Sequence, residues 1–515
     1  MPASETLCAL VGATRLVLGY IFFLFLLWLF LQTLRPTRHL PPGPYGSLIS
    51  GVIKALPRKE PWKVYAEWSK QFESPVISFR IFNRVTVVLN TLEAATTLLS
   101  HRSEWYSDRP RSVMYNEICG RGQAVFNIPA SHPRHKIYRK ILQTGLGKKA
   151  TENAKDIIQT EAFIFADGLR TNPDQWQTYI RRNAVGVIVK VAFGYRIESL
   201  SDSFVRIAEE SSNITAQALA PGRWLVDYFP FLQYLPSCLP GLGWKRQGLV
   251  WKERLNHLSG VPHSWVKEQM QSGYYEDSLT SNFLSEIQDN ASGNVKERED
   301  IVKWCAAALY AGAADTTVSA LTSFVLLMAL HPEEQKKAQL EVDQEFRSNF
   351  DFVDVTKVHK LSYLDAVLKE VLRFAPVGNM ALPHSASQSD EYLGYEIPKG
   401  STVVANVWAI LHDESIYPEP FVFKPSRFGS NGKSGNSPDT QMDPTTVAFG
   451  FGRRTCPGSH FAMTTMLVGM ACVLAEFNVE CDDPHSKLQT IEFTTGITSH
   501  VKPFPIRITR RIGTK

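Results

Sequence analysis

The 515-residue chain contains 55 lysine and arginine residues against 50 aspartate and glutamate residues, and 44% of it is hydrophobic. A net charge of +5 without a long basic run argues against a nucleic-acid partner. The seven cysteines are odd in number and scattered, without CxxC or zinc-type Cys/His spacing, so neither a disulfide framework nor a zinc module is supported. Length alone permits one large domain or about three ordinary ones.

The first predicted element is an apolar segment that carries no charge over residues 16–31. A bilayer core requires about 20 mainly apolar residues, so we predict a retained transmembrane anchor at residues 10–34, behind a lumenal N-terminus at residues 1–9. A cleaved signal peptide is disfavoured, because the run is too long and no small-residue cleavage site follows it. A buried core helix is disfavoured, because the segment is apolar all round and lies at the extreme N-terminus.

The charges around this segment predict its orientation. Arg35 and Arg38 follow it, whereas Glu5 precedes it. The positive-inside rule then places the body of the protein on the cytoplasmic side. We therefore expect a single-pass protein of the endoplasmic reticulum membrane.

The remaining elements are read in chain order. Proline and glycine stiffen a predicted linker at residues 35–47. No further linker divides residues 48–515, so we expect one large, mainly helical domain with a small β part. The predicted strands lie within residues 75–90 (two strands joined near Asn83), 391–397 and 402–408, and the predicted helices lie at about residues 150–169, 302–330, 363–374 and 460–476.

The strongest functional pattern is FGFGRRTCPG at residues 449–458. Gly450 and Gly452 allow tight backbone turns, and the predicted helix 460–476 follows directly. Cys456 therefore lies just before a helix N-terminus, where backbone N–H groups favour a thiolate. The alternative is a glycine-rich turn with an incidental cysteine.

This pattern resembles the haem-binding signature of the cytochrome P450 family, through Phe449, Gly452, Arg454, Cys456 and Gly458. The resemblance covers residues 40–515 and looks most like fungal enzymes of secondary metabolism. It implies the single-domain P450 fold with haem b as the cofactor. It further implies that Cys456 is the axial iron ligand, that Arg454 pairs with a haem propionate and that Phe449 shields the sulfur.

A second pattern is Glu370-Val-Leu-Arg373, whose charged residues share one face of a helix. Taken alone, this is an ordinary surface ion pair. In the family that the chain resembles, such a pair joins an arginine from a later segment, and Arg427 stands at that place here. The implied role is structural: the triad positions the cysteine loop.

A third pattern, Asp315-Thr316-Thr317, lies in the middle of the predicted helix 302–330. A threonine hydroxyl at this place could simply bond to the carbonyl four residues earlier. The segment resembles the family's oxygen-activating acid–alcohol pair, which implies catalytic roles for Asp315 and Thr316. Ala313 stands where glycine is common in the family.

Two weaker matches concern the haem propionates. Arg139 lies in a segment that resembles the family's Trp-x-x-x-Arg helix, although His135 replaces the tryptophan. His384 resembles a further propionate partner, and a satisfied structural histidine is the equal alternative.

The resemblance implies a monooxygenase that uses O₂ and electrons from NADPH–cytochrome P450 reductase, with cytochrome b5 as a second candidate donor. Segments near residues 114–128, 308–312, 377–382 and 494–498 would line the pocket, and their apolar character predicts a lipophilic substrate such as a terpenoid, polyketide or aromatic metabolite. One alternative is an enzyme of the same fold that rearranges or dehydrates a pre-oxygenated substrate without O₂. Another is a haem protein that binds without turnover.

Overall fold

The computed structural model describes residues 39–290, 293–346, 353–429, 441–482 and 491–511, and six residues between positions 17 and 24. Apart from those six residues, the predicted anchor at residues 10–34 lies outside the described residues. Within them, two helices are long and apolar enough to span a bilayer, Val295–Leu330 and Ser459–Glu476. Their most apolar windows are 78% and 67% buried inside the body, so their hydrophobicity serves the core.

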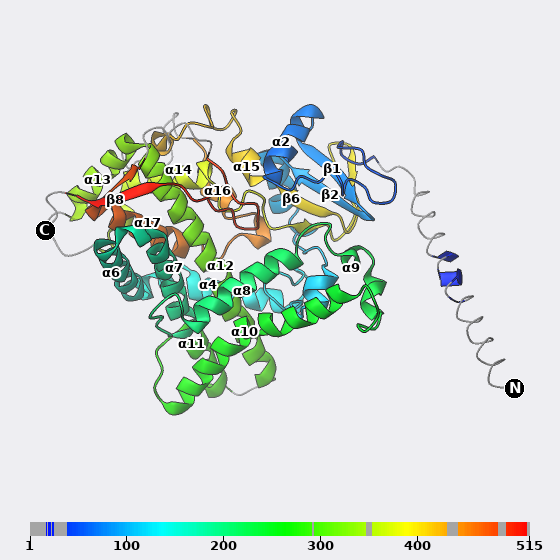
Figure 1. The fold of residues 1–515 in the computed structure, drawn as a ribbon, viewed down its shortest axis with the longest axis horizontal. Coiled ribbons are helices and arrows are strands. Elements are labelled where there is room, and N and C mark those ends of the chain that lie inside the picture. Colours follow the sequence, from blue (N-terminus) through cyan, green and yellow to red (C-terminus); the bar gives the residue numbers. More distant parts are fainter. Residues whose placement is uncertain are drawn as a thin grey trace.

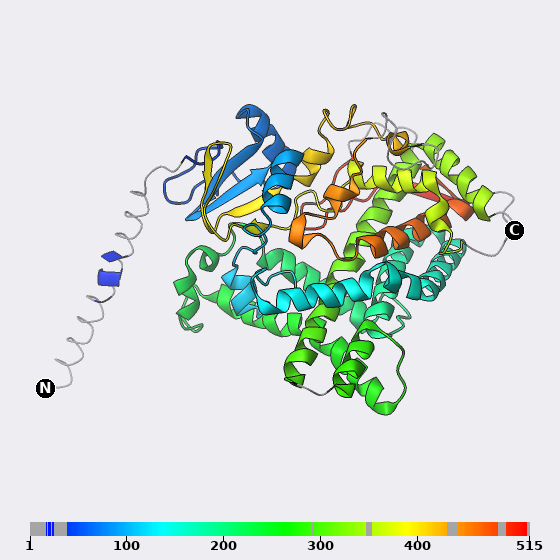
Figure 2. The ribbon, with the colours of Figure 1, turned by 180° about the vertical axis from the view of Figure 1, so that it is seen from behind.

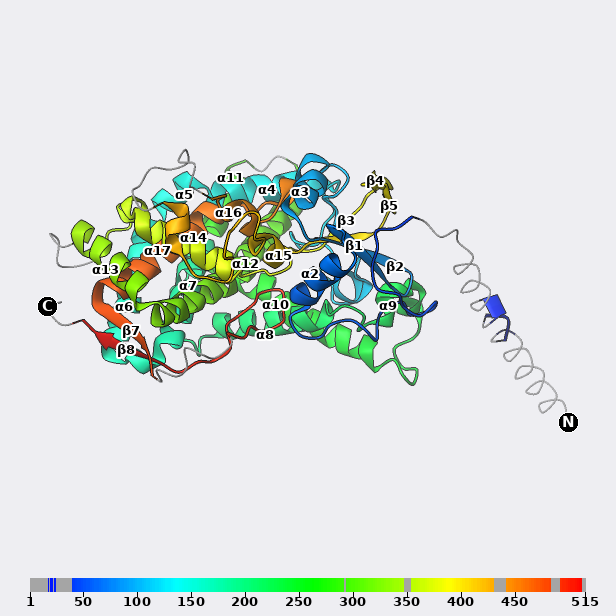
Figure 3. The same ribbon diagram turned by 90° about the horizontal axis from the view of Figure 1, so that it is seen from above.

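The body is mainly helical, and its largest sheet lies at one end. Figures 1 and 3 place strands β1 and β2 with helix α2 at one end of the body, opposite helix α13 and strand β8. Figure 2 shows the same division from behind. The prediction of a mainly α fold with a small β part is therefore confirmed. The principal helices are α2 (Pro61–Gln71), α4 (Pro133–Leu146), α5 (Lys148–Asn153), α6 (Lys155–Thr171), α7 (Trp176–Phe193), α8 (Ser203–Ala218), α10 (Gly243–Ser272), α11 (Leu279–Asp289), α12 (Val295–Leu330), α13 (Pro332–Phe346), α14 (Ser362–Phe374), α15 (Val407–Leu411), α16 (Thr445–Ala448) and α17 (Ser459–Glu476).

The main sheet has the strand order β1-β2-β6-β3. Strands β1 (Val76–Ile81) and β2 (Arg84–Leu89) form the predicted hairpin. Strand β6 (Thr402–Ala405) pairs with β2 in parallel and with β3 (His384–Ser385) in antiparallel register. The two smaller sheets are the hairpin of β4 (Asp390–Tyr392) with β5 (Tyr395–Ile397) and the pair of β7 (Phe477–Cys481) with β8 (Ile506–Arg510).

Helix α12 crosses the middle of the body and packs against α7, α4, α14 and α17. Its 36 residues give a rod about 54 Å long. It begins before the predicted residue 302, because Asn294 Oδ1 accepts the Glu297 N–H at 3.1 Å and caps a polar first turn. It ends at Leu330 before Pro332, as predicted.

Three other predicted elements differ from the structure. The helix at residues 150–169 is divided at Ala154 into α5 and α6. The strand at residues 391–397 is the β4–β5 hairpin, because Leu393 and Gly394 both take positive φ and turn the chain. The strand at residues 402–408 ends early, because the Asn406 side chain accepts the Ala409 N–H at 3.1 Å and starts helix α15.

The described part of the predicted linker contacts the sheet. Ser78 N donates to Pro42 O at 2.9 Å, and Ser78 Oγ donates to Pro41 O at 2.6 Å. A Cβ at Gly43 would lie 1.8 Å from Ser78 O, so this close approach requires glycine. Residues 41–43 are thus bound along strand β1.

Candidate active site

The cysteine loop connects α16 to α17. The backbone N–H of Cys456 donates to Phe449 O at 2.8 Å and closes the loop. Gly450 and Gly452 adopt φ values of 80° and 54°. A Cβ at Gly452 would lie 2.2 Å from Leu99 O, so this glycine also allows the loop to approach the neighbouring π-helical turn at Thr96–His101.

The Cys456 side chain is exposed, unlike those of Cys305 and Cys472. The surrounding protein nevertheless raises the pKa of the Cys456 thiol by desolvation, and the Gly458 N–H and Arg139 offset this only in part. The Gly458 N–H thus favours the thiolate, as expected at the helix terminus, but desolvation outweighs its effect. A metal ion held by Cys456 would supply the opposing positive charge, because metal binding deprotonates a thiol.

Three arginines lie around the loop and direct N–H groups at backbone carbonyls. Arg454 Nε donates to Ser107 O at 2.7 Å, and Arg139 Nη1 donates to Thr455 O at 2.6 Å. Arg109 Nη1 donates to the carbonyls of residues 382 and 383 at 2.8 and 2.7 Å. All three guanidinium groups thus bond to neutral acceptors. Arg139 lies close enough to Cys456 to lower the pKa of its thiol, and Arg109 lies beside Arg454.

Two histidines complete this basic cluster, which comprises Arg109, Arg139, Arg454, His135 and His384. Burial and then the neighbouring arginines lower the pKa of His135 to about 4 and that of His384 to about 3. The His384 Nδ1 pairs with the Tyr106 carbonyl. His135 Nε2 is buried and has no hydrogen-bond partner among the described residues.

The basic cluster has too little negative charge of its own. In the described ranges, none of its arginines forms an ion pair with a carboxylate. Burial lowers the pKa of Arg109 to about 9, and repulsion from Arg454 adds to the effect. Burial also lowers the pKa of Arg454 to about 10, and the attraction of Asp108 offsets this only in part. The Arg109 Nε is also buried without a partner. Buried cations of this kind require counter-ions, and the two carboxylates of a haem beside a cysteine ligand fit that need.

A cytochrome P450 family model matches residues 41–508. The chain belongs to the cytochrome P450 family. It is 35% identical to cytochrome P450 monooxygenase claR of Ampulloclitocybe clavipes, over 92% of this chain and 86% of that protein. It is 34% identical to cytochrome P450 monooxygenase ppsD of Aspergillus oryzae, over 96% and 93%. It is 32% identical to tryptamine 4-monooxygenase of Psilocybe cyanescens, over 92% and 93%. The protein is accordingly a P450 monooxygenase, an oxidoreductase.

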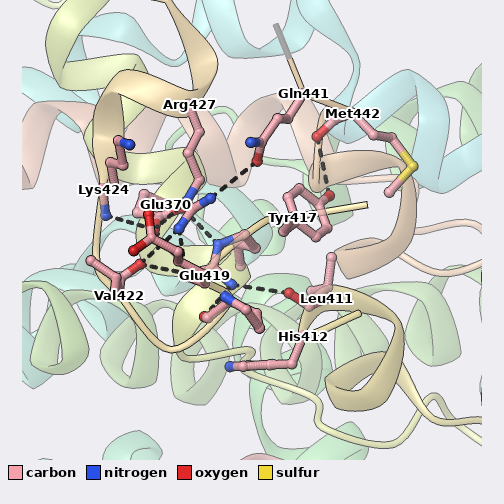
Figure 4. Close-up of polar contacts among 12 residues, drawn as sticks. Glu370, Leu411, His412, Tyr417, Glu419, Val422, Lys424, Arg427, Gln441 and Met442 are labelled. Atoms are coloured by element: carbon pink, nitrogen blue, oxygen red, sulfur yellow. Dashed lines mark hydrogen bonds and ion pairs between the residues drawn. The ribbon is translucent and has the colours of Figure 1, made fainter. Parts of the chain in front are cut away.

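The P450 triad is assembled and buried. Glu370 and Arg373 on α14 are both fully buried and form two hydrogen bonds, of 2.7 and 2.9 Å. Arg427 Nε lies 3.4 Å from Glu370 Oε1, and the Lys424 N–H donates to the same oxygen at 2.8 Å. Figure 4 shows the side chains of Glu370 and Arg427 facing one another. The surface alternative for this pair is therefore wrong.

Contacts extend from the triad toward the cysteine loop. Arg427 Nη1 lies 3.4 Å from Gln441 Oε1, and Tyr417 Oη donates to Met442 O at 3.1 Å (Figure 4). Lys369 on α14 forms an ion pair of 3.1 Å with Asp443. These residues directly precede α16, so Arg427 of the triad and its neighbours Tyr417 and Lys369 contact the start of the segment that carries Cys456.

The acid–alcohol segment of this P450 lies on an unbroken stretch of α12. Thr316 Oγ1 donates to Gly312 O at 2.9 Å, and Thr317 Oγ1 donates to Ala313 O at 2.8 Å. Both hydroxyl protons therefore bond within the helix, as the structural alternative holds, and each oxygen remains able to accept a hydrogen bond. Burial raises the pKa of Asp315, but hydrogen bonds from His500 and Thr498 outweigh burial and set it below its ordinary value.

The four segments expected to line the substrate pocket lie side by side in two pairs: residues 114–128 with 308–312, and residues 377–382 with 494–498. A Cβ at Gly312 would lie 3.2 Å from Phe126, and a Cβ at Gly378 would lie 4.0 Å from Ile497 O. Apolar side chains on these segments keep substantial exposed surface, namely Phe126, Leu382 and Ile497.

Sequence reasoning missed Arg109 and His500. Arg109 lies in a loop without a helical or strand pattern, and His500 follows a run of small polar residues. Neither position carries a motif, so the signal that identifies them is their place in the fold beside Arg454 and Asp315.

Proposed function

We propose that this P450 hydroxylates or otherwise oxidises a lipophilic small molecule, such as a terpenoid, polyketide or aromatic secondary metabolite. One atom of O₂ enters the substrate and the other leaves as water. Electrons come from NADPH through a membrane-bound reductase, with cytochrome b5 as a second candidate donor. The fungal monooxygenases among its relatives and the exposed apolar side chains of Phe126, Leu382 and Ile497 support this proposal.

The residues of the cysteine loop would hold the cofactor. When bound, haem b supplies the iron chemistry that activates O₂. Cys456 would ligate the iron, and Arg454, Arg139 and Arg109 would neutralise the propionates. His384 is a weaker propionate partner, because its Nδ1 is already bonded to a carbonyl and its low pKa keeps it neutral. Phe449 would cover the sulfur, while Gly452 allows the loop to turn.

The observation that carries the oxygenase proposal is the placement of Asp315 beside Thr316 on α12. Cleavage of O₂ to water requires protons, and a carboxylate with access to solvent can deliver them. The Asp315 side chain is 42% exposed. Thr316 is the next residue of the same helix. Thr316 would hold a water at its hydroxyl oxygen, and Asp315 would pass a proton to that water.

The proposed function is tested with full-length holoenzyme reconstituted with a reductase. We expect O₂-dependent oxidation of NADPH and, after co-expression with a reductase in a metabolite-producing host, a product heavier by one oxygen in mass spectrometry. Conversion without consumption of NADPH would instead support the rearranging enzyme. Haem binding without turnover of O₂ or any metabolite would support the non-catalytic alternative.

We also propose the placement in the cell. Residues 10–34 would anchor the protein in the endoplasmic reticulum membrane, with residues 1–9 in the lumen. Residues 35–47 would lead into the cytoplasmic domain at residues 48–515. The apolar run at residues 16–31 and the basic residues after it support this arrangement.

A further inference from the structure

A histidine from the C-terminal loop contacts the acid of helix α12. His500 Nε2 lies 3.1 Å from Asp315 Oδ1, and Thr498 also bonds to this carboxylate. The two side chains are partly exposed, 28% for His500 and 42% for Asp315. The pair can therefore exchange protons with solvent.

The loop holds this histidine by several backbone contacts. The His500 N–H donates to Thr494 Oγ1 at 3.0 Å, and the Thr494 N–H donates to His500 O at 2.8 Å. The Ser499 N–H donates to Val377 O at 2.8 Å, and the Ser499 carbonyl accepts from Ser319, one helical turn beyond the acid on α12. The position of the imidazole is thus built into the fold.

Among the charged groups around Asp315, only His500 is suited to supply it with a proton. Asp315, with its lowered pKa, is ionised at neutral pH and accepts a proton more readily than it donates one. The other charge that acts on Asp315 is Arg181 of α7, which pairs with Glu209 of α8 at 2.5 Å. Arginine keeps its protons, whereas histidine changes charge between about pH 5 and 8.

We propose that His500 is a positioning residue that reloads Asp315 with protons, so that a relay runs from solvent through His500 and Asp315 toward Thr316. The protonated imidazole gives its Nε2 proton to Asp315 Oδ1, and Asp315 passes a proton to a water at Thr316. The neutral imidazole then takes a proton from solvent. Only protons move, so no oxidant or reductant is required. The inference rests on the roles proposed above for Asp315 and Thr316.

The first test is His500→Gln, which keeps an N–H donor for Asp315 but cannot titrate. Full-length holoenzyme, reductase, NADPH and O₂ are combined without an organic substrate. O₂ is then reduced to hydrogen peroxide with one NADPH or to water with two, and the second route needs more protons at the site. We expect wild type to release a larger share of peroxide per NADPH as the pH rises from 6 to 8.5. At pH 6, His500→Gln should release about two-fold more peroxide per NADPH than wild type. This share should not rise further as the pH is raised to 8.5.

Two controls accompany this test. His257→Gln makes the same change at an exposed position of α10, and it should behave as wild type. The absorption spectrum of the reduced carbonyl complex checks that each variant folds and holds haem. If His500→Gln matches wild type at every pH while Thr316→Ala raises peroxide, the relay through His500 is overturned and the proposed function stands. If wild type oxidises no NADPH, both fail together.

The second test does not depend on turnover. Holoenzyme with ¹³C-labelled histidine is studied by NMR in its diamagnetic reduced carbonyl form, and the His500 ring signal is assigned by its loss in His500→Gln. Because His500 Nε2 contacts Asp315 Oδ1 at 3.1 Å, Asp315→Asn should move this ring signal and leave that of His257 in place. An unmoved His500 signal in Asp315→Asn would show that the contact is absent in solution and would overturn the inference whatever the activity.

Discussion

At the scale of single residues, the environments of the cysteines differ. Cys305 and Cys472 are buried within α12 and α17, where desolvation raises the pKa of each thiol far above its ordinary range. Cys481 lies in β7 and donates to Ala329 O at 3.6 Å. Cys456 alone among these four lies in the loop bordered by the basic cluster, and it is the proposed ligand.

We therefore expect Cys456→Ala to abolish the thiolate-type absorption shift of the reduced carbonyl complex. Cys305→Ala, Cys472→Ala and Cys481→Ala should retain it, because these side chains act as small apolar groups. The measurement is the carbonyl difference spectrum of purified protein. A normal spectrum from Cys456→Ala would contradict the assignment of the ligand.

Thr316 and Thr317 form a matched pair, because each hydroxyl bonds to the carbonyl four residues earlier, at 2.9 and 2.8 Å. Replacement by alanine removes the same helix contact in both. Thr316→Ala should leave the carbonyl spectrum intact but divert more NADPH to hydrogen peroxide, whereas Thr317→Ala should do much less, since its side chain points about 100° further round the helix. The assay compares peroxide with NADPH oxidised. Equal values in the two variants and wild type would show that the motif is structural.

The sequence predicted Cys456, Arg454 and Thr316 because each lies in a short motif with characteristic spacing. It did not predict Arg109, whose contacts come from segments distant along the chain. It predicted that backbone N–H groups favour the Cys456 thiolate, and the Gly458 N–H has this effect, but the larger opposing effect of desolvation depends on how much protein surrounds the sulfur. A short motif predicts which residues lie together in one loop or helix turn. It does not predict how deeply they are buried, because burial depends on the whole fold.

At the scale of elements, the triad joins α14 to the segment before the cysteine loop. Glu370→Ala would leave Arg373 buried without its anionic partner, which costs about 3–5 kcal/mol. We expect a low yield of holoprotein and early thermal unfolding, measured by carbonyl difference spectra and by scanning calorimetry.

The control is Asp365→Ala on the same helix, which removes a partly exposed ion pair of 3.0 Å with Lys369. Exposed pairs contribute about 0–1 kcal/mol, so this variant should remain close to wild type. Abundant, stable holoprotein from Glu370→Ala would show that the triad is dispensable.

Elements with a clean pattern were predicted best. The β1–β2 hairpin and helices α14 and α17 have the expected bounds to within a residue or two. Helix α10 was missed, because Pro262 within it reads as a helix terminator. The start of α12 was missed because its first turns are polar, and the apolar pattern begins only where the helix enters the core.

At the scale of the whole molecule, the segment at residues 39–42 is hydrogen-bonded to the rest of the catalytic body. His39 O accepts the Glu396 N–H at 2.7 Å, and Pro42 O accepts from strand β1. Removal of residues 1–34 should therefore leave the domain intact, move the protein from the membrane to the soluble fraction, and preserve haem incorporation. Fractionation and the carbonyl spectrum check this. Tight membrane binding of the shortened protein would contradict a single anchor and direct attention to the exposed Leu48 and Ile49.

The parallel pairing of β2 with β6 has a consequence for biosynthesis. Asn406 Nδ2 donates to Asn90 Oδ1 at 2.8 Å across 316 residues of chain. At a translation rate of about 5–20 residues per second, the edge of β2 remains unpaired for roughly 15–60 s until its partner strand β6 has been synthesised. During that interval the hairpin presents unpaired backbone groups to other nascent chains. Ribosome-bound chains that end before residue 402 should therefore recruit chaperones through β2, and release of the completed chain should end that association.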